Sequence, residues 1–225
     1  MHKTKELDDN SPSKNDRKDP RVIAGLVKDG RYFYSYMPTG VYAELRNASN
    51  RRSVLVEELT RVKNRLQKWI AVYFPEYKGI YTHIDAKGGL LVLKQAPTPE
   101  EIVKLGVEGI IKIWKDAKLR GNGHKKAMQI LNAAMRSIGL KIGLREARME
   151  IQDLIEDYEL QTKRLERIND LIKELCQQIK YANKLLEIKG IGITTVGGFI
   201  AEVGDNTKEL QKLAGLELVA DSSGK

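Results

Sequence analysis

Two aspartates near the start of the chain have a spacing that could serve a metal ion. Asp16 and Asp19 lie in the segment KNDRKD, and residues three apart on a helix share one face. Carboxylates placed in this way can hold a divalent cation, and nucleases of the two-metal kind use such groups. Two carboxylates do not complete a site of that kind, and a solvated run of charges explains the same residues. The spacing alone leaves both interpretations open.

A serine beside a glycine lies at the other end of the chain. Ser223 stands in the sequence SSGK, where a hydroxyl on an exposed turn close to a basic residue could act as a nucleophile. The same composition is typical of a flexible terminus. The histidines show no spacing typical of a catalytic triad or a zinc site and receive no role: His2, His83 and His124.

Paired glycines interrupt the apolar C-terminal region. Gly190 and Gly192 follow Lys189, and a new apolar helix is predicted from about Thr194 to Val203. Glycines allow a tight turn and a close approach of the backbone to a ligand. The amides that begin the second helix could then bind phosphate without contacting bases. The pattern predicts a helix-hairpin-helix element, and a plain glycine turn in a helical bundle is the alternative.

A long basic helix is predicted before the middle of the chain. Apolar residues recur at spacings of three, four and seven from Val41 to Trp69, which indicates a helix of about nine turns that ends at Pro75. The opposite face of this helix is basic, and five of its side chains are predicted to contact phosphates: Arg46, Arg51, Arg52, Lys63 and Lys68.

Composition supports a polyanionic partner. The 225 residues contain 39 Lys and Arg against 30 Asp and Glu, a net charge of +9, which favours nucleic acid over a basic protein with no such partner. The single cysteine, Cys176, excludes an intrachain disulfide and a multi-cysteine zinc site. No apolar run is long enough to span a bilayer, and the first ten residues do not resemble a secretory signal. These features predict a cytoplasmic protein.

A heptad pattern dominates the region from Leu144 to Leu186. The a positions are Leu144, Ile151, Tyr158, Leu165, Ile172, Ile179 and Leu186. The d positions are Ala147, Leu154, Gln161, Ile168, Leu175 and Ala182. Six consecutive heptads favour a coiled coil between chains, with the polar Gln161 helping to set the register. A long helix packed within its own domain is the alternative.

Three stretches together resemble a known family. They are similar to insertion-sequence transposases now called bridge-RNA-guided recombinases. The three stretches are ELDDNSPSKNDRKDPRVIAGLVKDGRY, the helix end WIAVYFPEY and the tail LLEIKGIGITTVGGFIAEVGD. That family joins a RuvC-like DEDD domain to a C-terminal transposase domain with a catalytic serine. Asp16 and Asp19 match its third and fourth acids, and Ser223 matches the serine. The first two acids of the set would lie upstream of this chain, and most of the C-terminal domain would lie downstream.

The resemblance implies DNA transposition, in which strands are cut and rejoined at the ends of the element, with Mg²⁺ held by Asp16 and Asp19. It implies DNA, a guide RNA and sister subunits as partners, and a chain truncated at both ends that is inactive alone. The alternative is a non-enzymatic, coiled-coil nucleic-acid-binding protein. The fold is predicted to be mainly α, with four regions: a RuvC-like remnant at 1–40, a helical middle at 41–140, a coiled-coil helix at 141–187 and the start of the transposase domain at 188–225.

Overall fold

The computed structural model describes residues 18–31, 37–121 and 123–204. α-Helices are the regular elements in these ranges, and no β-strand occurs within them. The predicted mainly α fold is therefore confirmed. The chain divides into two compact units, residues 1–38 and 39–225. None of the described helices combines the length and the apolar character needed to cross a membrane.

The first unit contains the helix α2, Lys18–Lys28. The sequence indicated a short apolar helix or strand here, and the structure shows a helix. It ends at Gly30, whose φ of +66° lies in the left-handed region that glycine adopts without strain. The amide of Arg31 donates to the carbonyl of Leu26 across this turn at 2.9 Å.

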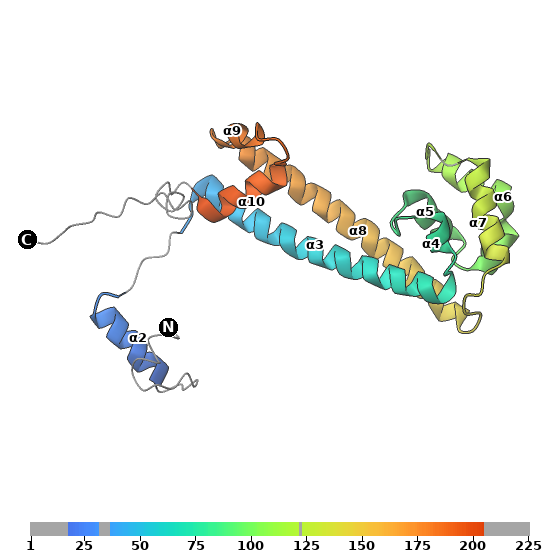
Figure 1. Ribbon diagram of the computed structural model, residues 1–225, viewed down its shortest axis with the longest axis horizontal. Helices are drawn as coiled ribbons and strands as arrows, with labels where there is room; N and C mark the ends of the chain where they lie inside the picture. The colour runs from blue at the N-terminus through green and yellow to red at the C-terminus, as the bar shows by residue number, and fades with distance from the viewer. Residues whose placement is uncertain (1–17, 32–36, 122, 205–225) are drawn as a thin grey trace, which may run out of the picture. The chain divides into compact units, whose positions relative to one another are not determined.

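The second unit is built on two long antiparallel helices, α3, Gly40–Tyr73, and α8, Leu144–Gln177 (Figure 1). Each has 34 residues and is therefore about 50 Å long. α3 confirms the predicted helix and ends just before Pro75. Its buried residues follow the predicted apolar stripe: Leu45, Ala48, Leu55, Val62, Leu66, Trp69 and Ile70.

The heptad face of α8 packs against α3 of the same chain. Ile151 and Leu154 are fully buried, and Ile172 is only 1% exposed. The indole of Trp69 in α3 donates to the carbonyl of Ala147 at 2.9 Å, which joins the end of one helix to the start of the other. The partner of this face is thus intrachain, as in the alternative of a long helix packed within its own domain. A second chain could reach these positions only by displacing α3.

α8 is shorter than the heptad pattern indicated. It ends at Gln177, and a turn leads to the short helix α9, Ala182–Leu186, and then to α10, Ile193–Val203. Ile179 and Ala182 keep their buried positions although the helix has stopped. The break lets the chain fold back, so that α10 packs across α3 and α8. Apolar burial is thereby retained without a continuous helix.

A helical lobe, residues 74–143, connects the two long helices. It contains α4, Tyr77–Ile80, α5, Lys87–Gln95, α6, Pro99–Asp116, and α7, His124–Met135 (Figure 1). The start of α6 follows from its local sequence, because Thr98-Pro99-Glu100-Glu101 provides an N-cap, a proline at the first helical position and acids in the first turn. The hydroxyl of Thr98 accepts from the amide of Glu101, and the Glu101 carboxylate accepts from the amide of Thr98, which forms a capping box.

The helix α5 was not predicted, because Gly88 and Gly89 favour a loop. Tertiary contacts explain why both glycines are helical. The indole of Trp114 donates to the carbonyl of Gly88 at 2.8 Å. A side chain on Gly89 would collide with the rings of Tyr77 and Tyr81. Burial of these tyrosines raises the pKa of both phenols, that of Tyr81 to about 12.

The second unit has two hydrophobic clusters. The larger joins the lobe to the end of α3 and the start of α8, and contains Trp69, Trp114 and Ile151. The smaller lies at the other end of the helix pair and contains Leu45, Ile172 and Ile200. Gln161, the polar d position, belongs to neither cluster and is only partly buried. The two ends of the helix pair are thus stabilised by separate clusters.

A half-buried carboxylate joins the lobe to both long helices. Asp85 Oδ2 lies 2.6 Å from Nζ of Lys63 in α3, and it accepts a hydrogen bond from Tyr158 of α8 at 3.3 Å. The hydrogen bond from Lys63 lowers the pKa of Asp85, and partial burial opposes it. Because the folded-state pKa is depressed, the carboxylate stabilises the fold above the ordinary Asp pKa of about 3.9, and this stabilisation is lost as the pH falls through the folded value.

We therefore expect Asp85→Asn to lower the free energy of unfolding by about 1 kcal/mol at neutral pH, since the pair is partly exposed. The difference from wild type should shrink below about pH 4, where the wild-type carboxylate also becomes neutral. Urea unfolding at neutral and acidic pH measures both effects. Asp116→Asn is the matched control, because Asp116 is exposed and has no ion pair among the described residues. An equal loss in the two variants would contradict the assigned link.

Candidate nucleic-acid interface

The basic side chains predicted on α3 fall into two groups. Arg46 donates through Nε to the carbonyl of Ala201 at 3.1 Å, at the end of α10. Arg52 donates through Nε to Oδ1 of Asn169 in α8 at 2.8 Å, and Lys63 pairs with Asp85. These three cations hold the fold together. A phosphate would have to compete with those contacts to bind them.

Arg51 and Lys68 form the other group. Both side chains are exposed, and neither makes a hydrogen bond or ion pair within the described ranges. Cations without protein partners can be offered to an external anion without breaking an existing contact. The structure therefore leaves these two of the five predicted residues available for phosphate.

Arg51 lines a groove of about 850 Å³ between α3 and α8. Two arginines of α8, Arg164 and Arg167, line the same groove and have no ion pair in the described part of the chain. The sequence analysis missed both because they fall between heptad positions, where charges are usually solvated. Carboxylates also line the groove: Glu44, Asp170 and Glu174. Its charge is therefore mixed, and it favours an anion only locally, at the arginines.

The predicted glycine turn lies between α9 and α10. Gly190 has φ of +89°, a backbone conformation that is strained for any residue with a side chain. Gly192 is the N-cap of α10. Lys189, Gly190 and Gly192 are exposed. The turn is thus open to solvent and has a cation beside it, as a phosphate-binding turn requires.

The two sides of this turn differ in burial. Val196 and Ile200 after the turn are buried, whereas Ile188 before it is 50% exposed. α10 is instead held through its other contacts. The hydroxyl of Tyr181 donates to the carbonyl of Gly204 at 2.6 Å, and Gly197 lies close to Ile172 of α8. α9 has only five residues, so the first arm of the hairpin is short.

The predicted catalytic residues lie largely outside the described residues. Asp16 and Ser223 are not among them. For Asp19 the structure describes the backbone, which is part of α2, but not the side chain. Elsewhere in the described part of the chain, no group of three or more His, Cys, Asp or Glu side chains could hold a metal ion. Those ranges by themselves do not assemble a Mg²⁺ site. Cys176 is buried in the smaller cluster, and this burial raises the pKa of its thiol.

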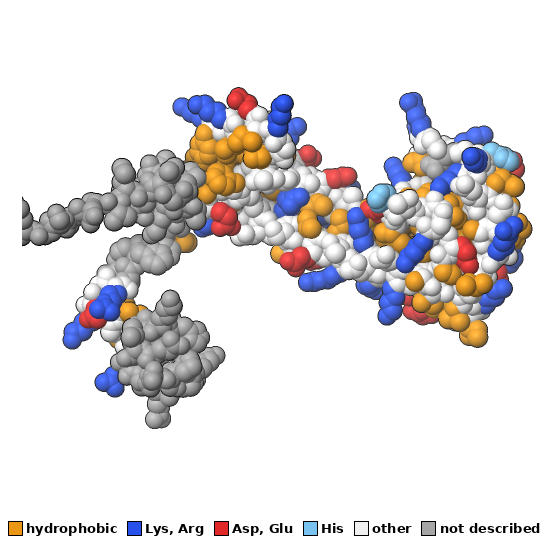
Figure 2. All heavy atoms as spheres, viewed as in Figure 1, with side chains coloured by type: hydrophobic (Ala, Val, Ile, Leu, Met, Phe, Trp, Pro, Cys, Tyr) orange, Lys and Arg blue, Asp and Glu red, His pale blue; other side chains and the backbone are white. Residues whose placement is uncertain are grey.

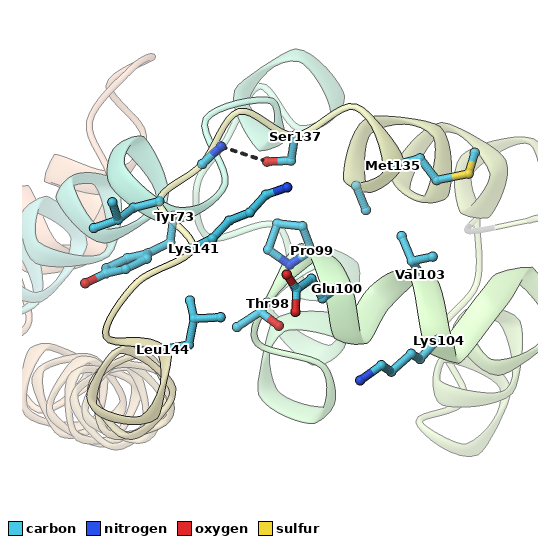
Figure 3. Close-up of a pocket in the computed structure, with 13 residues that line it drawn as sticks. Tyr73, Thr98, Pro99, Glu100, Val103, Lys104, Met135, Ser137, Lys141 and Leu144 are labelled. Atoms are coloured by element: carbon cyan, nitrogen blue, oxygen red, sulfur yellow. Dashed lines mark hydrogen bonds between the residues drawn. The ribbon is translucent and has the colours of Figure 1, made fainter.

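A pocket of about 570 Å³ lies at the base of the lobe (Figure 3). Its lining is mainly apolar, with Lys104 and Lys141 among the polar residues. Ser137 also lines it, but its hydroxyl donates to Oε2 of Glu76 at 2.7 Å. The same hydroxyl accepts from the amide of Gly139 at 3.2 Å (Figure 3). Burial of Glu76 acts to raise the pKa of its carboxyl group, but hydrogen bonds from the Ile138 amide and from Ser137 outweigh it and lower the pKa. This carboxylate holds the loop after α7 and is a poor base for catalysis.

Comparisons with known proteins match both ends of the chain. Residues 1–75 match a family model described as a transposase, of the IS110 DEDD type. Residues 182–225 match the family model described as the transposase IS116/IS110/IS902 family. The insertion element IS116 uncharacterized 44.8 kDa protein of Streptomyces clavuligerus is 25% identical over 218 residues, which is 94% of this chain and 54% of that protein. The chain therefore spans about half the length of the curated relative it matches.

Proposed function

We propose that this chain acts in DNA transposition as part of a transposase of the IS110/IS116 type. The observation that carries the proposal is the order of the two matched segments. The DEDD transposase segment comes first and the IS116/IS110/IS902 segment follows, and an insertion-element protein is similar across nearly the whole chain. The order agrees with the resemblance seen in the sequence. Strand cutting and rejoining at the ends of an insertion sequence is the corresponding reaction.

Contacts between the two matched segments support a shared role. α3 belongs to the first segment and α10 to the second, and the two helices pack against each other. Arg46 joins them through the carbonyl of Ala201. A DNA strand held at the Lys189–Gly192 turn would therefore have a defined position relative to α3. The turn and the free cations Arg51 and Lys68 are the proposed contacts to the DNA backbone.

The chemical step of the proposal follows from the family resemblance. Asp16 and Asp19 fall within the first matched segment, and they would supply carboxylates to Mg²⁺. Ser223 falls within the second, and its hydroxyl would lose its proton and attack a phosphodiester. The bond from phosphorus to one sugar oxygen would break, one strand end would leave as a hydroxyl, and the other would stay on the serine as a phosphate ester. A guide RNA and sister subunits complete the proposed assembly, on the strength of the family resemblance.

A transposition assay tests the proposal. A marker bounded by the DNA that flanks the gene is expected to join a target plasmid in cells that make this chain as part of the full-length transposase. Ser223→Ala should lower the frequency to background, because it removes the proposed nucleophile. Ser222→Ala is the neighbouring control and should leave transfer largely unchanged. Equal transfer with and without the chain would contradict the proposed function.

A further inference from the structure

The positive charge of this protein is concentrated in the lobe. Residues 74–143 contain twelve Lys and Arg but only six Asp and Glu. The two long helices α3 and α8 together contain thirteen basic and twelve acidic residues, so they are nearly neutral. Most of the chain's net charge of +9 therefore belongs to a region that lies between the two segments matched by transposase families.

Internal contacts increase this imbalance at the surface. Three of the six acids of the lobe are held by intramolecular bonds: Glu76 by Ser137 and the Ile138 amide, Asp85 by Lys63 and Tyr158, and Glu101 by Thr98 and Arg148. Of the basic side chains, only Lys94 and Lys126 have partners within the described ranges. The remaining cations project into solvent, and Figure 2 shows many of them on the visible face of the lobe.

The densest group lies at the end of the α6–α7 hairpin, here called the lobe tip. It consists of Lys112, Lys115, Lys118, Arg120 and Lys125, all exposed and all without an ion pair or side-chain hydrogen bond among the described residues. α6 and α7 pack against each other, and the start of α6 and the end of α7 meet in the pocket at the base of the lobe. Because the hairpin is antiparallel, the five cations gather at its opposite end.

The backbone of the lobe tip is held in place on its α6 side. The amide of Leu119 donates to the carbonyl of Trp114 at 2.8 Å, and that of Lys118 donates to Lys115 at 2.9 Å. Trp114 itself is only 1% exposed and is anchored to Gly88. The cations from Lys112 to Lys118 thus extend from a backbone that hydrogen bonds hold in place, which lowers the entropy that a bound partner must remove.

We propose that the lobe tip is a second nucleic-acid-binding surface, which contacts the phosphodiester backbone and is separate from the Lys189–Gly192 turn. Five free cations, carried by the end of α6, the connecting turn and the start of α7, match a polymer of phosphates. Among the described residues from 112 to 126 no Phe, Tyr or Trp side chain is exposed and the only exposed ring is the imidazole of His124, so contacts from the cations to phosphates dominate there. Binding is therefore independent of sequence and sensitive to salt. The inference extends the proposed function but stands on the charge and geometry of the lobe alone.

Two matched triple variants test it. The tip variant carries Lys115→Gln, Arg120→Gln and Lys125→Gln. The base variant carries Lys104→Gln, Arg136→Gln and Lys141→Gln, which removes the same charge from exposed positions at the other end of the hairpin. Affinity for a short duplex DNA of unrelated sequence, and for an RNA hairpin of equal phosphate number, is measured by fluorescence anisotropy over about 50 to 200 mM salt.

The tip variant is expected to bind at least about tenfold more weakly, and its log–log salt slope should be shallower by about 2 to 3. The base variant should bind within about twofold of wild type, because its three missing charges lie away from the proposed contact and salt screens their effect on the nucleic acid. Whichever nucleic acid shows the larger loss is the one that the lobe tip holds. A tip variant that keeps its arginine and carries Lys115→Arg and Lys125→Arg should bind as wild type does.

Three results would overturn the proposal: equal losses in both triple variants, no loss in the tip variant, or no binding by the wild-type chain at low salt. The outcome is distinct from that of the transposition assay. Marker transfer together with normal binding by the tip variant would refute the lobe tip alone. Selective loss of binding without any marker transfer would refute the proposed function alone.

Discussion

Replacement of Ile172 by asparagine is expected to lower the free energy of unfolding by about 3 to 5 kcal/mol. Ile172 is 1% exposed and belongs to the cluster that joins α3, α8 and α10. Its Cγ2 atom lies so close to Gly197 that a methyl group there would have to displace it. The asparagine amide would lose its hydration at this position and find only apolar neighbours. Denaturant unfolding followed by circular dichroism measures the loss.

Leu171→Asn provides the matched control, because Leu171 is 40% exposed on the same helix. Its effect should stay within about 0.5 kcal/mol. Light scattering on the folded Ile172→Asn chain separates the two possible partners of the heptad face. If the variant kept its stability and merely changed from dimer to monomer, the heptad face would pack between chains and the assigned contact with α3 would be wrong.

Truncation of Trp114 to alanine is expected to be about as damaging, at about 3 to 5 kcal/mol. The indole is buried at the centre of the lobe, and its Nε1 donates to the carbonyl of Gly88. Its loss would leave a cavity and would also remove the hydrogen bond that joins α6 to α5. Trp114→Phe should cost about 1 to 2 kcal/mol, because it keeps most of the packing and loses the hydrogen bond.

Hydrogen exchange shows where the Trp114→Ala variant loosens. Amides of α5 and α6 should lose protection first, while those of α3 beside Ile172 should keep it, because a separate cluster stabilises that end of the helix pair. Val103→Ala is the control on α6, since Val103 is 40% exposed. Uniform loss of protection along α3 and α8 would show that the two clusters unfold together and would contradict their independence.

Local signals in the sequence determined most of the helices. The apolar stripe from Val41 to Trp69 predicted α3, and the pattern Thr98-Pro-Glu-Glu101 predicted the start of α6. Both depend on interactions between residues three or four apart, so a short stretch of sequence is enough to recognise them. α5 was missed for the opposite reason. Its glycines are helical because Trp114 and Tyr77 pack on them from distant positions in the chain.

The candidate interface shows the same division. Gly190 and Gly192 were recognised from sequence, and the structure places both in an exposed turn before α10. The basic face of α3 was also recognised, yet sequence does not show which cations have partners. Arg46 and Arg52 are bound by groups more than 100 residues away. That the five cations of the lobe tip have no ion-pair partner among the described residues became visible only in the tertiary structure.

The heptad of α8 shows where the limit lies. Its periodicity determined that one face of the helix must leave water, and the structure buries that face. The buried stripe also includes Ile155 and Cys176 at e positions, which makes it wider than the seam of a two-stranded coiled coil. Only the tertiary structure decided that α3 covers it. Burial of a face is dictated by the spacing of its own residues, whereas its partner is chosen by competition among all the apolar faces that the chain can bring to it.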